Sequence, residues 1–268
     1  MTQPMMIFPV PAPVRQDSFD LHQTLIDSLE RAQITLQPGD VLAISSKYAA
    51  IAEGRTVRLD DIVVTPEAAA LAERYAMNPT IAQLVMQEAD HIFGGIPGFL
   101  LTHKDGIISP NAGIDRSNIP SGNAVLFPRD PYATAEQIRQ MLLTRLGVQV
   151  GVILTDSWLM PGRLGTTGVA LATAGFRPLA DERGKADLFG NAMQVTVRGL
   201  SDQICAAAQL VMGERDEATP FALVRGADVQ MSDTPITVAD VAIDWRMCIY
   251  VESLTEGLLQ TVQMSHGG

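Results

Sequence analysis

The stretch TAEQIRQMLLTRLGVQVGVILTDS, residues 134–157, sets a helix directly before a strand and decides the fold class. Residues 134–137 match a capping box, and apolar residues at helical spacing continue to Leu146, after which Gly147 ends the predicted helix. The β-branched run 148–154 predicts a buried strand. Residues 155–157 are polar, so we expect their side chains to emerge at the end of that strand.

Other predicted elements lie on both sides of this pair. Thr65 and Pro66 predict the start of an Ala-rich helix, and the segment QICAAAQLVM predicts another, capped by Ser201 or Asp202 and ended by Gly213. Because helices and strands do not alternate regularly, the pattern favours an α+β fold over a doubly wound one.

The chain shows no repeat, linker or low-complexity segment that would divide it. We therefore expect a single unit of residues 1–268. Residues 162–200 are rich in Gly, Thr and Asp and are typical of loops and short strands. A smaller inserted subdomain around residues 162–200 is the alternative organisation.

The composition limits the partners that the protein can have. The net charge of −11 and the absence of a basic run argue against binding to nucleic acid or to anionic membranes. No apolar run reaches 18 residues, and the N-terminus lacks the basic region of a signal peptide. Cys205 and Cys248 have apolar neighbours, as expected for reduced core residues of a cytoplasmic protein.

Familiar catalytic motifs are absent from the sequence. It contains no GxxxxGK[ST] phosphate loop, no HExxH, no GxSxG and no GxGxxG after a strand, and its four histidines are scattered. A nucleotide site would have to be built differently. In so acidic a chain, bound Mg²⁺ or Mn²⁺ would supply the positive charge that anionic substrates need.

Several polar clusters interrupt apolar surroundings. The segment 111–118 is suited to a tight turn that presents oxygens to a cation or phosphate, and Asp156 with Ser157 offers metal ligands at a strand end. The acids of residues 214–217 follow a helix, where the helix dipole disfavours them unless a cation compensates. Lys47 is suited to phosphate, and Arg163 to phosphate or carboxylate. Each cluster also has an ordinary structural interpretation as a turn, a cap or a solvated surface.

Five motifs in order carry a family resemblance: GDVLAISSKYAAIAEGR, NAGIDRSN, TDSWLMPGRLGTTGVALATAGF, KADLFG and AAAQLVMGERDEATP. Together they resemble the coenzyme F420-0 gamma-glutamyl ligase family and its relatives in folate metabolism, over nearly the whole chain to about residue 226. The resemblance implies a family-specific α+β fold with mixed sheets and flanking helices, and an intertwined homodimer. It also implies GTP or ATP as co-substrate, two Mg²⁺ or Mn²⁺ ions and a monovalent cation.

The resemblance also implies roles for individual residues. Asp115 and Asp156 are expected to bind one metal ion, and Ser157 and Glu214 a second. Asp156 and Arg163 are the expected catalytic residues. The expected nucleotide contacts are Ser46, Lys47, Asn118, Met212, Gly213, Arg215 and Thr219.

Two departures separate this chain from the coenzyme F420 enzymes. Ile51 stands where they usually have a lysine, and of the two arginines in their DTxGRPWR motif only Arg163 remains. At both positions this chain is more similar to the folate-type branch of the family. The expected acceptor is therefore a folate-like or a coenzyme F420-type carboxylate.

The expected reaction joins the acceptor carboxylate to the amine of L-glutamate through an acyl phosphate. Two alternatives remain open at this point. The same metal ions would also suit a phosphohydrolase, and the loss of a lysine at position 51 would also suit a non-catalytic nucleotide-binding dimer.

Overall fold

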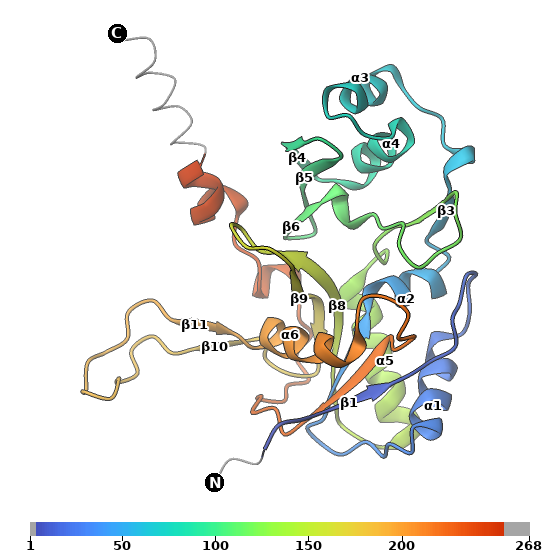
Figure 1. Cartoon of the computed structure of the whole chain (residues 1–268). Helices are drawn as coiled ribbons and strands as arrows, with labels where there is room; N and C mark the ends of the chain where they lie inside the picture. Colours follow the sequence, from blue (N-terminus) through green and yellow to red (C-terminus); the bar gives the residue numbers. More distant parts are fainter. Residues whose placement is uncertain (1–3, 255–268) are drawn as a thin grey trace.

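A computed structural model describes residues 4–254, and its centre is a five-stranded mixed sheet. The strand order is β1 (Met6–Val10), β12 (Phe221–Arg225), β2 (Val41–Ser45), β8 (Gly151–Leu159) and β9 (Thr166–Ala174). β2 and β8 run parallel, and the other neighbours are antiparallel. β9 therefore forms one edge of the sheet (Figure 1).

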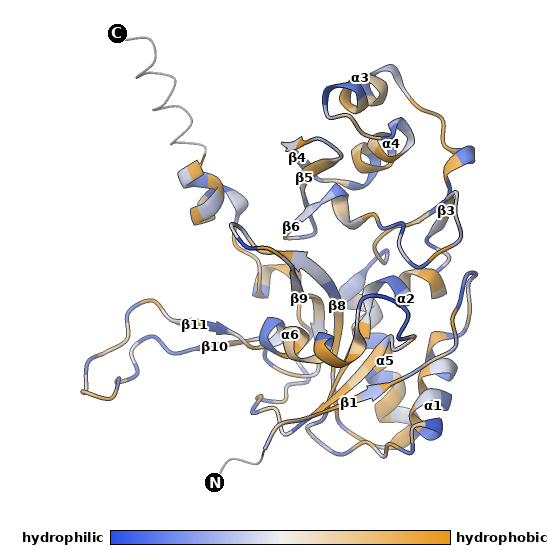
Figure 2. Ribbon diagram, viewed as in Figure 1, coloured by the Kyte–Doolittle hydropathy of each residue, from blue (hydrophilic) through white to orange (hydrophobic). Residues whose placement is uncertain are grey.

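Helices cover both faces of this sheet. α1 (Leu21–Arg31) and α5 (Pro131–Leu146) pack on one face, where Leu42 and Leu154 lie in the same core cluster as Ile138. α6 (Leu200–Met212) packs on the other face, against Ala43 and Ile153. The apolar side chains of β2 and β8 alternate between the two faces, as the pleat of a strand buried on both sides requires. Figure 2 shows hydrophobic residues concentrated in the strands of this sheet.

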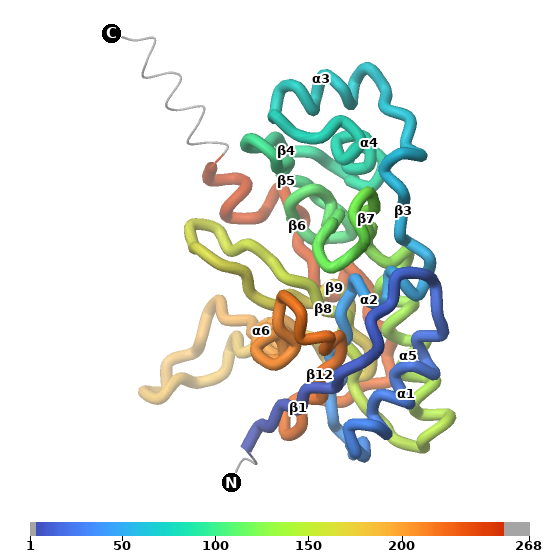
Figure 3. Tube along the Cα trace, turned by 45° about the vertical axis from the view of Figure 1, so that its right-hand side comes forward, coloured from blue at the N-terminus to red at the C-terminus, as the bar shows by residue number. Residues whose placement is uncertain are grey.

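A smaller layer lies above one end of the central sheet (Figure 3). It contains the three-stranded sheet β4 (His91–Ile96), β5 (Phe99–Lys104) and β6 (Ile107–Pro110), together with α3 (Pro66–Arg74) and α4 (Pro79–Glu88). Its own apolar cluster includes Leu84, Leu100 and Leu126. The pair β3 (Thr56–Arg58) and β7 (Asn123–Val125) connects this layer to α2 (Ser46–Ala52).

The predicted α+β class is confirmed, and several predicted boundaries are corrected. Asp130, rather than Thr134, caps α5 by accepting from the Ala133 N–H, because Pro131 occupies the first helical position. Thr134 lies inside the helix, where its hydroxyl donates to Glu53. The predicted C-terminal Gly147 is confirmed, with φ of 69°.

The caps predicted for α6 are wrong. Gly199 precedes the helix and no side chain caps it, while Ser201 and Asp202 lie in the first turn. Asp202 instead accepts from the Ala170 N–H of β9, and the Thr173 hydroxyl donates to Ser201. Both side chains therefore fasten the helix to the sheet edge.

The segment 162–200 contains more regular structure than its composition suggested. Residues 166–174 form β9, a nine-residue strand of the central sheet, and not a loop. β10 (Leu179–Asp181) and β11 (Val197–Gly199) then begin and end a hairpin that projects from the body of the molecule (Figure 1). Within residues 4–254, no helix is long and apolar enough to cross a membrane.

Candidate functional site

The site begins where the pairing between the parallel strands β2 and β8 ends. Ser45 of β2 pairs with Thr155 of β8, so Ser46 and Asp156 follow at the same edge of the sheet. The Ser46 hydroxyl, on the first residue of α2, donates to Oδ2 of Asp156 at 2.8 Å. Asp156 itself lies inside β8, which continues to Leu159 on β9 beyond the last residue of β2. The expectation that residues 155–157 follow the strand end is therefore wrong, and Asp156 lies half-buried in β8 past the last residue of β2.

Asp115 reaches this end of the β2–β8 pair through a strained turn. Ala112 and Gly113 both have positive φ, at 52° and 71°, and a side chain on Gly113 would collide with the ring of Phe127. Only glycine fits both the conformation and the space at this position. Asp115 then pairs its backbone with Val125, which fixes the direction in which its carboxylate points.

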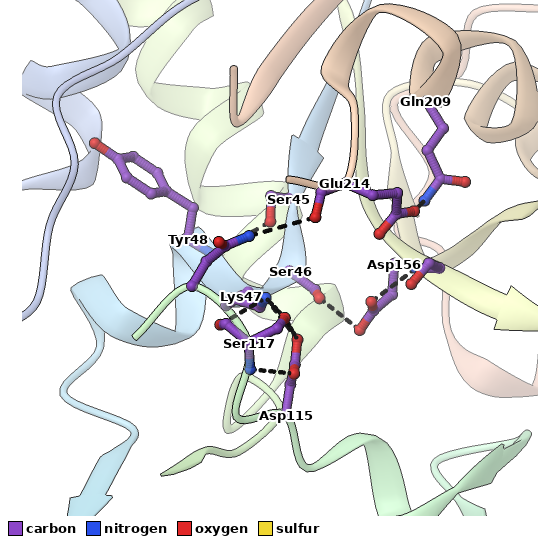
Figure 4. Close-up of polar contacts among 11 residues, drawn as sticks. Ser45, Ser46, Lys47, Tyr48, Asp115, Ser117, Asp156, Gln209 and Glu214 are labelled. Carbon is purple, nitrogen blue, oxygen red and sulfur yellow. Dashed lines mark hydrogen bonds and ion pairs between the residues drawn. The ribbon is translucent and has the colours of Figure 1, made fainter. Parts of the chain in front are cut away.

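Lys47 lies at the centre of the polar contacts (Figure 4). Its ammonium group forms an ion pair with Oδ2 of Asp115 at 2.5 Å and donates to the Ser117 hydroxyl at 2.8 Å. The Ser117 N–H and hydroxyl also donate to Asp115, at 2.7 and 2.9 Å. One turn along α2 from Lys47, Ile51 is buried against Val125. Lys47 is thus the lysine that α2 contributes to the site.

The loop after α6 approaches from the opposite side. Glu214 follows the helix-ending Gly213, and Gln209 donates to its carboxylate at 2.5 Å. The Asn118 side-chain amide donates to the Glu214 carbonyl oxygen at 3.4 Å. In Figure 4 the carboxylates of Asp156 and Glu214 are drawn on the same side of Lys47. We call the group Ser46, Lys47, Asp115, Ser117, Asp156 and Glu214 the Lys47 cluster.

The carboxylates of the Lys47 cluster differ in how well they are neutralised. Burial raises the pKa of Asp156 to about 6, against hydrogen bonds from Ser46 and the Ser157 N–H. Burial, with repulsion from Asp115, also raises the pKa of Glu214. For Asp115, burial acts in the same direction, but Lys47 and Ser117 outweigh it and lower its pKa. One ammonium group thus compensates one of three carboxylates.

The side-chain oxygens of this site are of the chemical type that binds a hard divalent cation. The side chains of Asp115, Asp156, Ser157 and Glu214 offer only carboxylate and hydroxyl oxygens, which Mg²⁺ and Mn²⁺ prefer. Neither Asp156 nor Glu214 forms an ion pair within residues 4–254, and burial raises the pKa of both despite the nearby charge of Lys47. Among residues 4–254, no three His, Cys, Asp or Glu side chains are already close enough to hold one ion. Lys47 pairs with Asp115 in this arrangement.

Other predicted nucleotide contacts lie along the loop after α6, with different exposure. The Met212 side chain is buried in the core cluster under α6. Thr219 is also buried, and its hydroxyl donates to the Glu217 carbonyl oxygen. Arg215 is exposed and pairs with Asp216. Gly213 has φ of 72° and ends the helix. The loop can therefore offer a ligand its backbone and Arg215, but not the side chain of Met212.

Arg163 is not brought into the Lys47 cluster. It lies in the exposed turn between β8 and β9, where its backbone N–H donates to the Met160 carbonyl oxygen. Within the described part of the chain its guanidinium has no ion-pair partner. Sequence reasoning missed the roles of Ser117 and Gln209. The spacing of Ser117, two residues after Asp115, was a signal of a side-chain turn, whereas nothing in the sequence pairs Gln209 with Glu214.

Comparisons with known proteins cover most of the chain. The family model described as F420-0:Gamma-glutamyl ligase matches residues 10–226. A Coenzyme F420:L-glutamate ligase of Methanopyrus kandleri is 40% identical over 208 residues, which are 77% of this chain and 81% of that protein. Proteins of the same name from Archaeoglobus fulgidus and Haloarcula marismortui are 35% and 39% identical, over 83% and 73% of this chain and 88% and 79% of theirs.

Proposed function

The chain belongs to the F420-0:gamma-glutamyl ligase family, and from this premise we propose that it joins L-glutamate to a small carboxylate acceptor at the expense of GTP or ATP. It is an acid–amino-acid ligase, an enzyme that forms gamma-glutamyl amide bonds. Neither the nucleotide nor the acceptor follows from family membership alone, so both parts of the proposal depend on the site.

One observation carries the proposal. Four segments far apart in the sequence, at residues 46–47, 115–118, 156–157 and 209–214, meet in the Lys47 cluster. Lys47 forms an ion pair with Asp115 there, and Asp156 accepts from the neighbouring Ser46 beyond the last residue of β2 (Figure 4). Fold stability gains little from such an arrangement, because the carboxylate of Asp156 is desolvated without an ion pair among the described residues. Clusters of this kind with shifted pKa values are typical of functional sites.

The proposed reaction requires an activated carboxylate, because a carboxylate is a poor electrophile. The terminal phosphoryl group of the nucleotide is transferred to an acceptor carboxylate oxygen, giving an acyl phosphate and a nucleoside diphosphate. The glutamate amine then attacks the acyl carbon, the carbon–oxygen bond to phosphate breaks, and inorganic phosphate leaves with that oxygen. Phosphoryl transfer needs chiefly positioning and charge stabilisation from the protein.

The residues of the chain have distinct tasks in this proposal. Lys47 acts as a point charge on the nucleotide phosphates. Asn118 and the backbone of the loop 212–219 hold the nucleotide from the other side, with Arg215 at its exposed part. The Arg163 guanidinium, which has no partner among residues 4–254, orients a substrate carboxylate.

The proposed metal ligands are those that the family resemblance implies, and their oxygen atoms suit a divalent cation. Asp115 and Asp156 would hold one divalent ion, and Ser157 and Glu214 a second. When bound, the ions would offset the negative charge of the phosphates. Ser46 donates to Asp156 and so keeps that carboxylate oriented.

The acceptor is the least specified part of the proposal. The relatives named Coenzyme F420:L-glutamate ligase favour a coenzyme F420-type acceptor, and a folate-like acceptor follows from the departures at Ile51 and in the turn of Arg163. Both are flat aromatic ring systems that carry an anionic arm. Such a reaction belongs in the cytoplasm, where nucleoside triphosphates are available.

We propose that the protein acts as a homodimer. The hairpin that projects between β10 and β11 exposes Leu188, Phe189 and Val195 almost completely, at 99%, 89% and 85%. Figure 2 shows hydrophobic and hydrophilic residues mixed along this hairpin. Apolar side chains on a projecting arm are expected to pack against a second copy of the chain.

A product assay tests the proposed function. The purified protein is incubated with Mg²⁺ or Mn²⁺, GTP or ATP, L-glutamate and either a coenzyme F420-type or a folate-like acceptor. The expected result is a mass increase of the acceptor by one glutamyl group, with nucleoside diphosphate formed only when acceptor and glutamate are both present. Diphosphate formation without either substrate would instead indicate a phosphohydrolase. No turnover with any acceptor would favour a non-catalytic nucleotide-binding dimer.

A further inference from the structure

A large apolar cavity lies beside the Lys47 cluster, along the open edge of the central sheet. Its volume is about 740 Å³, within the usual range for small-molecule pockets. Its floor includes Val169, Ala170 and Ala172 of the edge strand β9. Five aromatic side chains contribute to its walls: Phe93, Tyr132, Trp158, Trp245 and Tyr250.

The strand β8 connects this cavity to the Lys47 cluster. Trp158 lines the cavity and follows Asp156 by two residues on the same strand, about 7 Å along the chain at the rise of a β-strand. The indole N–H of Trp158 donates to the Ile108 carbonyl oxygen of β6 at 2.8 Å, which fixes the ring against the cavity wall. Side chains two residues apart on a strand point to the same face, so Trp158 and Asp156 lie on one face of β8.

The outer wall of the cavity comes from the segment 241–254. This segment lies beyond residue 226, where the family match ends. Trp245 stacks on His91 with ring centroids 4.8 Å apart and meets Phe93 edge-on at 5.1 Å. Figure 1 shows the C-terminal segment in red beside β9 and below β4. The wall is thus fastened to the smaller layer, and it belongs to this chain and not to the matched family region.

Polar groups in the cavity wall are few, and several already have partners. Asp202 accepts from the Ala170 N–H, and Ser201 accepts from the Thr173 hydroxyl. The Trp158 N–H is likewise used within the protein. The wall therefore offers mainly apolar and aromatic contact, which suits a flat ring rather than a sugar or a phosphate.

We propose that this cavity holds the flat aromatic ring system of the acceptor, and that the segment 241–254 is a wall that selects among such rings. The inference rests on the proposed function, because it identifies the ring as part of the ligase acceptor. The anionic arm of the acceptor would extend along β8 from Trp158 toward Asp156. Deazaflavins and pterins share the chemistry that the cavity recognises, and an experiment separates them.

The tryptophans of the chain make a direct binding assay possible. The protein has two, and both Trp158 and Trp245 line the cavity. Their fluorescence is titrated with a 5-deazaflavin that lacks a phosphate-bearing side chain and, separately, with pteroic acid, without nucleotide or metal. Saturable quenching by one of the two is expected, and the tighter one identifies the ring class.

A pair of matched variants tests the wall. Ile243 is 62% exposed and lines the cavity, so Ile243→Asp should fold while its charge repels an apolar ring. Leu210→Asp is the control, because Leu210 is 85% exposed on α6 and does not line the cavity. Ile243→Asp should weaken ring binding at least tenfold and raise the KM for the acceptor without changing that for the nucleotide. Leu210→Asp should leave both unchanged.

Several outcomes would overturn the assignment. The absence of saturable quenching by either ring, or unchanged ring affinity in Ile243→Asp, would exclude the cavity as the ring site. A change of molecular mass in solution for Ile243→Asp, with ring affinity unchanged, would show that a second copy covers the segment instead. Glutamyl transfer with a normal acceptor KM in this variant would overturn the cavity assignment and leave the proposed function standing. Ring binding without any ligation would support the cavity and refute the proposed function.

Discussion

Asp156→Asn should stabilise the metal-free protein at neutral and alkaline pH while abolishing turnover. The pKa of Asp156 in the folded protein is about 6, raised by burial from 3.8. The folded state therefore binds a proton between these values that the unfolded state has released, and its stability falls as the pH rises through that window. Above pH 6 the ionised carboxylate remains a fixed cost, which asparagine does not have.

The magnitude follows from the two pKa values. They differ by about 2, and each tenfold change in an ionisation equilibrium corresponds to about 1.4 kcal/mol. Asp156→Asn should thus raise the free energy of unfolding by about 3 kcal/mol at pH 8, and by less than about 1 kcal/mol at pH 4. Ser46 and the Ser157 N–H donate to different oxygens of Asp156, so the asparagine oxygen can keep the bond from the Ser157 N–H while its amide group donates to the Ser46 hydroxyl.

Urea denaturation in the presence of EDTA, at pH 4 and pH 8, measures this difference. Asp60→Asn is the matched control, because it removes the same charge from an exposed side chain outside the Lys47 cluster. Added Mg²⁺ should stabilise the wild type and not Asp156→Asn, since a ligand stabilises only the state that binds it. A pH-independent difference between Asp156→Asn and the wild type, or a less stable variant at pH 8, would refute the electrostatic reasoning about the site.

Three further predictions concern the same charges and one distant ion pair. Asp115→Asn and Glu214→Gln should each raise the metal concentration needed for half-maximal activity, and unchanged metal titrations would remove both residues from the ligand set. Lys47→Met should raise the nucleotide KM at least tenfold, because it removes the ammonium group from the phosphates; an unchanged KM would contradict this role. Asp40→Asn should lower the free energy of unfolding by about 3 kcal/mol, because the 2%-exposed Asp40 binds Arg225 through both of its oxygens. Urea denaturation measures this loss, and a loss well under about 1 kcal/mol would contradict the importance of the buried ion pair.

Local signals predicted those elements whose ends are determined by neighbouring residues. Thr65 caps α3 as its sequence indicates, and Gly147 ends α5 in the left-handed conformation. The cap of α5 was misassigned because Asp130 followed by Pro131 competes with the pattern at Thr134, and both patterns are locally acceptable. Sequence spacing cannot decide between two acceptable caps, since the choice depends on where the helix packs.

Long-range pairing explains the larger errors. β8 continues through Asp156 to Leu159 because β9 pairs with it over that length, and β9 arises from a Gly- and Thr-rich segment with the composition of a loop. The partner of a strand is not encoded in the strand itself. The same limitation applies to the site, because Lys47 and Asp115 are brought together by tertiary structure and no local pattern pairs them.

The acidic composition opposes nucleotide binding unless positive charge is supplied, and the Lys47 cluster indicates where that charge is needed. Asp156 and Glu214 have raised pKa values beside a single lysine that already neutralises Asp115. A triphosphate brought to this edge of the sheet would add negative charge to a place that is already short of positive charge, and Lys47 cannot compensate for all of it. Cations must therefore accompany the nucleotide if it binds here. The charges of the site thus support the proposed metal dependence.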